Sequence, residues 1–141
     1  MSKQIESFGV PWEKDYGYAQ AVRHGDTIYL SGQVSHDGPE LVAPAPVDDA
    51  GRVTSVAGMA DQMRQCYANA AELLGRFGAT LDDVVEETLY VVDADEGDAA
   101  AKVVRKEAYG RPDPQVASTM IGIARLAFPE LLVEIRMIAR R

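Results

Sequence analysis

With 141 residues and no change of composition along its length, the chain is expected to form a single domain over residues 1–141 that buries most of its apolar surface. A formal net charge of −8 without a cluster of Lys and Arg opposes contact with a phosphate backbone, so nucleic acid is excluded as an expected partner. One cysteine and two histidines exclude an internal disulfide and the usual zinc sites, and no apolar run has the length of a membrane span or signal peptide, which predicts a cytoplasmic protein without a metal.

The N-terminal third predicts a β-hairpin and then a long loop. Two runs rich in β-branched and aromatic residues, Tyr18–Arg23 and Thr27–Ser31, flank His24-Gly25-Asp26, whose Gly and Asp suit a tight turn. From His36 to Arg52 the chain is rich in Pro, Gly and Asp without a sustained period, which predicts a loop that could border a site. His36 itself is not expected to be catalytic, and Trp12 is expected to pack on the surface or against a neighbouring subunit rather than bind a ligand.

A helix is predicted next, over Ser55–Phe77. Its apolar residues recur at spacings of three and four and so share one helical face: Met59, Met63, Cys66, Tyr67, Ala70, Leu73, Leu74 and Phe77. Thr54 or Ser55 could cap its start, and Gly78 is placed to end it. Cys66 is expected to pack in the core rather than act as a nucleophile, because no His lies near it in the sequence.

The C-terminal half predicts a strand, a helix and two more strands. A strand within Leu81–Asp93 is followed by a helix over Ala99–Tyr109 and by strands over Val116–Ala124 and Leu132–Ala139. In the strand within Leu81–Asp93, alternation predicts that three apolar residues lie on one side: Val85, Leu89 and Val91. The order ββαβαββ indicates an α+β domain in which a mixed sheet carries two helices on one face. Because no predicted helix remains for the second face, we expect another subunit to cover it.

Alternation along the last two strands assigns side chains to the two faces of the sheet. In Val116–Ala124 the more aliphatic parity is expected to pack under the helices, which turns Ser118 and Met120 toward the helix-free face. In Leu132–Ala139 the wholly apolar parity packs under the helices and leaves Glu134 on the helix-free face. If the two strands pair as a hairpin, Ser118 and Glu134 share that face.

Glu134 interrupts an otherwise apolar strand, and two interpretations of it stay open. One is a solvated carboxylate paired across the sheet with Arg136 or Arg125. The other is a general acid and base in a cleft, where partial burial would raise its pKa toward the working range.

Five runs of sequence, together with a helix that carries Gln62 and Asn69, cover nearly the whole chain: YAQAV, GDTIYLSGQV, GATLDDVVEETLYVVD, VASTMIGIARL and LLVEIRMIA. In this order they resemble the Rid family, also called the YjgF or RutC family and labelled L-PSP endoribonuclease in older usage. The resemblance implies a chorismate-mutase-like α+β fold, a homotrimer, and three clefts between subunits that bind small carboxylate or carbonyl compounds. It also implies hydrolysis of reactive enamines and imines, such as 2-aminoacrylate, to a keto acid and ammonia without a metal or organic cofactor.

The resemblance assigns roles to individual residues. The family's pocket tyrosine falls on Tyr18, and its Ser-Gly backbone contact falls on Ser31 and Gly32. Its acidic residue falls on Glu134. All four positions match the family pattern, which makes Glu134 the expected catalytic residue and the other three expected substrate contacts.

The chain departs from the family pattern where the family holds its substrate-binding arginine, because Ser118 occupies that position. On the same strand Met120 replaces a common cysteine, and both residues are expected to contact the substrate. A guanidinium forms a bidentate pair with a carboxylate that a hydroxyl cannot copy, and its loss costs on the order of 2 to 5 kcal/mol. Simple 2-imino acids are therefore expected to be poor substrates, unless Arg23, Arg111 or Arg125 holds the carboxylate.

Two functions are consistent with these residues. The first is a cofactor-free hydrolase, or deaminase, of small enamine and imine metabolites at inter-subunit clefts, with a pathway-specific compound such as an aminomuconate as a candidate substrate. In this hypothesis Glu134 orients water and shuttles protons while Ser31, Gly32 and Ser118 position the substrate. The alternative is a non-catalytic trimeric protein that binds a small molecule or serves as an accessory subunit. The acidic balance disfavours a ribonuclease.

Overall fold

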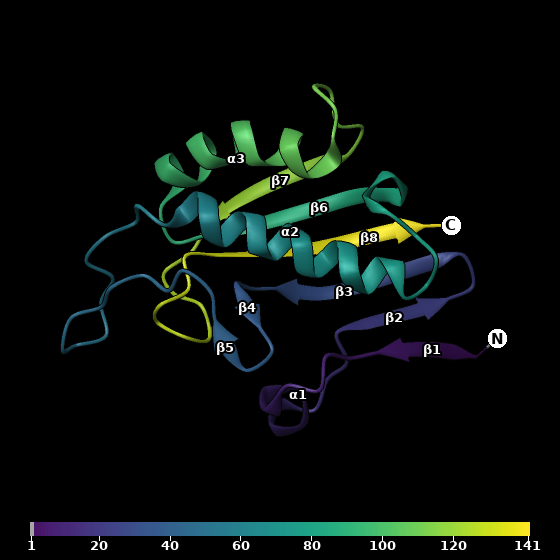
Figure 1. The fold of residues 1–141 in the computed structure, drawn as a ribbon, viewed down its shortest axis with the longest axis horizontal. Coiled ribbons are helices and arrows are strands. Elements are labelled where there is room, and N and C mark those ends of the chain that lie inside the picture. Colours follow the sequence, from purple (N-terminus) through teal and green to yellow (C-terminus); the bar gives the residue numbers. More distant parts are fainter. Residues whose placement is uncertain (1) are drawn as a thin grey trace.

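The computed structural model describes residues 2–141, which form a six-stranded mixed sheet with two helices across one face (Figure 1). The strand order is β1-β2-β3-β8-β6-β7, and all neighbouring strands are antiparallel except β6 and β7. The helices on the sheet are α2 (Met59–Gly75) and α3 (Ala94–Tyr109). The strands are β1 (Lys3–Glu6), β2 (Ala21–His24), β3 (Thr27–Gln33), β6 (Val84–Val91), β7 (Ala117–Gly122) and β8 (Val133–Arg140). The predicted α+β class, with both helices on one face, is confirmed.

Several short elements were not predicted from the sequence. They are β1, the helix α1 (Pro11–Tyr16), the small hairpin of β4 (His36–Asp37) and β5 (Glu40–Leu41), and the 3₁₀ helix η1 (Leu81–Asp83). Each is six residues long or shorter, which is too short for a period to be recognised. None of the helices in residues 2–141 is long and apolar enough to cross a membrane.

The core lies between the sheet and α2. The predicted face of α2 is buried against alternate residues of the three central strands: Ile28, Leu30, Leu89, Val91, Val133, Ile135 and Met137. Burial of each such aliphatic side chain contributes about 1.5 to 3 kcal/mol. Cys66 lies in this core as predicted, and burial raises the pKa of its thiol, which keeps the sulfur protonated and unreactive.

Two helix starts differ from the sequence prediction. α2 begins at Met59, and neither Thr54 nor Ser55 caps it. α3 begins at Ala94, five residues earlier than predicted, because Asp93 caps it by accepting a hydrogen bond from an amide of the first turn (2.9 Å). After each helix the chain turns at a glycine in the left-handed region: Gly78 (φ +75°), as predicted, and Gly110 (φ +68°).

The last two strands do not form the predicted hairpin. β8 lies between β3 and β6, and β7 pairs in parallel with the other side of β6. β7 also shows the opposite faces to those predicted, since Ser118 and Met120 lie on the helix side and Ile121 is 41% exposed. A register shift in β6 between Val84 and Glu86 likewise leaves Val85, predicted on the same side as Leu89 and Val91, 46% exposed. Glu87 faces inward because it alternates in step with the buried Leu89 and Val91. Polar contacts with α3 set the orientation of β7, an edge strand whose two faces differ little in apolar content.

Glu87 is a buried carboxylate at the centre of a polar cluster. It is 1% exposed and accepts hydrogen bonds from Tyr67 Oη of α2 and from Arg105 Nε of α3, both at 2.6 Å. Arg105 Nη2 also donates to Ser118 Oγ at 2.9 Å. The cluster therefore links both helices to β6 and β7.

Replacing Glu87 by Gln is expected to lower the free energy of unfolding by about 2 to 3 kcal/mol, because Arg105 then lacks its counter-charge. This is less than the cost of a fully buried unpaired charge, since the Arg105 side chain is 24% exposed. Glu86→Gln at the exposed neighbouring position is the matched control, with a change within about 0.5 kcal/mol. Urea unfolding measures both, and equal midpoints for the two variants would contradict a structural role of the Glu87 cluster.

Candidate functional site

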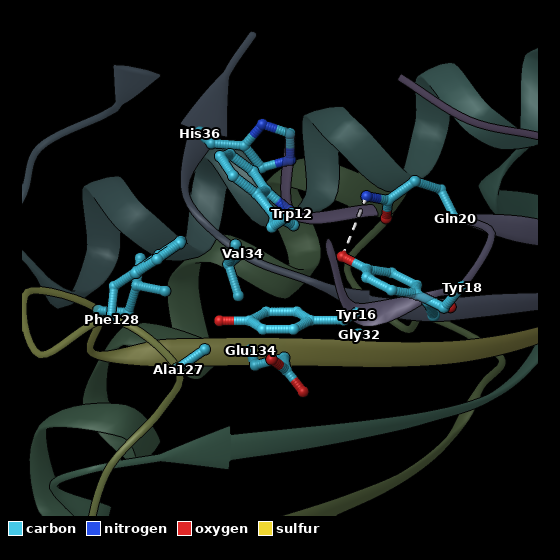
Figure 2. Close-up of a pocket in the computed structure, with 12 residues that line it drawn as sticks. Trp12, Tyr16, Tyr18, Gln20, Gly32, Val34, His36, Ala127, Phe128 and Glu134 are labelled. Carbon is cyan, nitrogen blue, oxygen red and sulfur yellow. Dashed lines mark hydrogen bonds between the residues drawn. The ribbon is translucent and has the colours of Figure 1, made fainter. Parts of the chain in front are cut away.

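A cavity of about 260 Å³ lies where β3 and β8 meet α1 and the loop between β7 and β8 (Figure 2). The residues that line it are Trp12, Tyr16, Tyr18, Gln20, Ser31, Gly32, Val34, His36, Ala127, Phe128, Leu131 and Glu134. Four of the six residues predicted to form the site are in this lining: Tyr18, Ser31, Gly32 and Glu134. They come together because β3 and β8 are neighbours in the sheet.

Glu134 supplies the carboxylate in the cavity. Its neighbours Val133 and Ile135 are buried under the helices, so alternation turns Glu134 to the helix-free face, as predicted. Burial raises the pKa of its carboxyl. Within residues 2–141 this carboxylate has neither a hydrogen bond nor an ion pair, so the interpretation that paired it with Arg136 or Arg125 is wrong. An acid in this state is free to exchange protons with a bound molecule.

Gly32 provides the space that the Glu134 side chain occupies. A β-carbon at Gly32 would overlap Glu134 Oε2 and lie 2.5 Å from its Cδ. The backbone conformation of Gly32 does not require glycine, because its φ is not in the left-handed region. The register shift of β3 between Leu30 and Gln33 places this glycine at a bulge opposite β8. Glycine is therefore needed here for the close approach of a carboxylate.

Hydrogen bonds with neighbouring groups hold Ser31 in place. Its hydroxyl donates to the Ala19 carbonyl at 2.7 Å, and its own carbonyl accepts a hydrogen bond from Gln33 Nε2 at 2.9 Å. Gln33 also donates to Gln20 Oε1 at 2.9 Å. These contacts fix the backbone of Ser31 and Gly32 beside the cavity.

Tyr18 brings a phenol to the cavity. Its Oη accepts a hydrogen bond from Gln20 Nε2 at 3.4 Å, which is drawn in Figure 2. Burial raises the pKa of Tyr18, and the nearby Glu13 and Glu134 carboxylates add to the shift. The phenol is therefore protonated at neutral pH and can donate to a bound molecule.

The aromatic wall of the cavity was missed in the sequence. Trp12 makes edge-to-face contacts with Phe128 and His36, with ring centroids 5.5 and 5.2 Å apart respectively. Trp12 thus lines the cavity, whereas it was expected to pack on the surface or against a neighbouring subunit rather than bind a ligand. His36 is 3% exposed and donates from Nδ1 to the Gly38 carbonyl at 2.9 Å, which fixes its ring. The run PWEKDYGY, with three aromatic residues in eight positions, was the signal available for this wall.

The short helix α1 positions two of these aromatic residues. Trp12 and Tyr16 are four residues apart, so they project from neighbouring positions on one side of the helix. Glu13 is 7% exposed and accepts hydrogen bonds from the amides of Phe8 and Gly9, both at 2.9 Å. This buried carboxylate fastens α1 to the chain that precedes it.

The other predicted site residues lie elsewhere. Ser118 and Met120 do not line the cavity, because β6 separates β7 from β8. None of the arginines considered as substitutes reaches it. Arg23 donates to the backbone carbonyls of Phe77 and Arg141. Arg111 pairs with Asp113, and Arg125 donates to the Leu126 carbonyl. The lining contains neither Lys nor Arg. In the described part of the chain no three His, Cys, Asp or Glu residues are grouped so as to hold a metal ion.

Gly32→Ala is expected to lower the free energy of unfolding by about 1 to 3 kcal/mol, because the added methyl must displace the Glu134 carboxylate. In a Glu134→Ala background the same substitution is expected to cost much less, since the displaced group is gone. Gly122→Ala on β7 is the matched control, because a β-carbon there meets no atom within 4 Å. Urea unfolding of the set gives the coupling, and an equal cost of Gly32→Ala in both backgrounds would show that Gly32 does not make room for Glu134.

Comparisons with known proteins agree on one family. The family model described as Endoribonuclease L-PSP matches residues 13–141. The Schizosaccharomyces pombe protein named mmf1, mitochondrial, is 29% identical over 124 residues, which cover 86% of this chain and 67% of that protein. The 2-iminobutanoate/2-iminopropanoate deaminase of Dermatophagoides farinae is 29% identical over 111 residues, which cover 77% of this chain and 74% of the deaminase.

A solved structure gives the same result for the fold. The crystal structure of Rv2704 from Mycobacterium tuberculosis, described as a member of the YjgF/YER057c/UK114 family, superimposes with a TM-score of 0.73. The two chains are 30% identical, and the match covers 99% of this chain and 100% of that one. The mixed sheet with helices on one face is therefore shared over the full length of both chains.

Proposed function

Because the chain belongs to the endoribonuclease L-PSP family, also called the Rid, YjgF or RutC family, we propose that it hydrolyses small enamine or imine metabolites to a carbonyl compound and ammonia. The observation that carries the proposal is the Glu134 carboxylate, which faces the cavity without a protein partner and whose pKa burial raises. The name of the D. farinae relative, an imine deaminase, supports this reaction class.

The proposed reaction uses Glu134 for proton transfer. A water oxygen bonds to the carbon of a C=N group, and the electron pair of the π bond moves to nitrogen. Glu134 accepts a proton from the attacking water and returns it to nitrogen, which gives a carbinolamine. It then accepts the proton of the new hydroxyl group and passes it to nitrogen, so that the C=O bond forms as the C–N bond breaks and ammonia leaves. An enamine reaches the same stage after its carbon takes up a proton. A carboxyl whose pKa is raised can both accept and donate protons nearer to neutral pH than an ordinary one.

The other residues of the lining position the substrate in this proposal. Tyr18 donates a hydrogen bond from its protonated phenol, and the fixed backbone of Ser31 and Gly32 holds the substrate beside the carboxylate. Ser118 and Met120 contribute only if a neighbouring subunit brings its β7 to this cavity, because they do not reach it within one chain.

We further propose that the chain assembles as a homotrimer in the cytoplasm and forms the cleft between subunits. The helix-free face of the sheet supports this assembly, since it exposes large apolar side chains, with Tyr29 43% and Ile121 41% exposed. Such surfaces usually mark protein interfaces. The location in the cytoplasm stays a prediction.

The alternative is a trimeric small-molecule binder or accessory subunit without turnover. The observation in its favour is that Arg105, whose guanidinium lies beside the Ser118 hydroxyl, is already paired with Glu87. No free cation therefore stands at the position where relatives hold a substrate carboxylate. An activity on RNA is not part of either proposal, because the cavity lining has no Lys or Arg and the chain carries a net charge of −8.

Ammonia release from a panel of enamines and imines generated in solution tests the proposal. Glu134→Gln is expected to lower the rate by about 10²- to 10⁴-fold while light scattering and circular dichroism show an unchanged assembly and fold. Because the carboxylate form is the base, wild-type rates are expected to fall as the pH drops through the raised pKa of Glu134. Equal rates for the two proteins would remove Glu134 from the mechanism. A ligand that stabilises the wild type while no ammonia is released from any compound would favour the binding protein instead.

A further inference from the structure

Aromatic rings surround the cavity on several sides. Trp12, Tyr16, Tyr18 and Phe128 all line it, and in Figure 2 they are spread around the space above Glu134. Two of these rings are not used in the core, since Tyr16 is 67% and Tyr18 37% exposed. Their faces are therefore available to a bound molecule.

The charge of the cavity has one sign. Glu134 faces it without a counter-ion, and the lining that one chain supplies contains no Lys or Arg. The other titratable side chains that face the cavity are Tyr16, Tyr18 and His36, and the ring of His36 is held by the Gly38 carbonyl. A ligand carboxylate would face the Glu134 carboxylate with no compensating cation, whereas a cation would gain that attraction. The rings add to the preference, because the faces of aromatic side chains attract cations.

We propose that the Glu134 cavity selects ligands that carry a cationic nitrogen on a flat, apolar skeleton and rejects ligands that carry a carboxylate. The inference rests on the proposed function, because it specifies the substrate class of the same site. Its substrates are then protonated imines, in which the C=N nitrogen bears the positive charge and lies beside Glu134, without a carboxylate on the neighbouring carbon. The aromatic rings of the lining stack on the flat conjugated system of the ligand. The Glu134 carboxylate lies next to the carbon that water attacks.

The protein contains its own reporter of binding at this site. Trp12 is the single tryptophan of the chain and lines the cavity, so the intrinsic tryptophan fluorescence comes from the site itself. Benzylammonium, benzyl alcohol and benzoate form a probe series that keeps the phenyl ring and changes the charge from positive to neutral to negative. Titration of the full-length protein with each probe at pH 7.5 gives three dissociation constants.

Benzylammonium is expected to bind about tenfold or more tightly than benzyl alcohol, and benzoate is expected to bind most weakly. Glu134→Gln should bring the constants of benzylammonium and benzyl alcohol together, because it removes the charge and keeps the shape. Glu130→Gln is the matched control: it makes the same change of charge in the neighbouring loop, outside the lining, and should keep the preference. Benzoate binding as tightly as benzylammonium, or a preference that persists in Glu134→Gln, would overturn the inference.

Measuring turnover distinguishes a failure of this inference from a failure of the proposed function. If benzylammonium is preferred but no imine is hydrolysed, the proposed hydrolase activity is wrong and the proposed cation selectivity stands. If 2-iminopropanoate is hydrolysed faster than a carboxylate-free imine, the hydrolase stands and the selectivity is wrong.

Discussion

The site depends on the close approach of one glycine to one carboxylate. β3 and β8 are neighbours in the sheet, and at Gly32 the absence of a side chain leaves a space that the Glu134 carboxyl occupies. Any larger residue at this position would drive the acid out of the cavity. The pairing of β3 with β8 and the bulge in β3 set this relation, and the Gln33 side chain fixes the backbone at Ser31. The chemistry that we propose therefore begins with a packing constraint between two central strands.

Two acidic residues of the sheet, Glu87 and Glu134, lie in different kinds of environment. Glu87 faces the helices, where Tyr67 and Arg105 satisfy it, so its charge is compensated and it serves the structure. Glu134 faces the other side, where aromatic rings exclude water from part of its surface and nothing neutralises it. Burial without a partner destabilises the ionised form of a carboxyl. Groups whose pKa is shifted in this way are frequently found at functional sites. One carboxylate is thus part of a structural cluster, and the other faces the cavity.

Sequence patterns were sufficient where many residues repeat one signal. The apolar stripe of α2 and the alternation of β8 predicted their buried faces correctly, including the outward position of Glu134. The edge strand β7 carries a weak pattern, and its orientation follows from a long-range contact between Ser118 and Arg105 that local sequence does not encode. α1 is a single short helix, so the aromatic wall that it carries shows no period. The meeting of Tyr18, Ser31, Gly32 and Glu134 followed from the family resemblance alone, since it depends on which strands are neighbours.

The most direct measurement is the titration of the Glu134 carboxyl by carbon-13 NMR in protein labelled at its glutamate side chains. The resonance is assigned by its absence from the spectrum of Glu134→Gln. A partly buried carboxyl without a counter-charge should titrate clearly above the value of about 4.3 that is ordinary for glutamate. A midpoint at or below that value would mean that the carboxylate is well solvated or paired, and that the cavity does not prepare it for proton transfer.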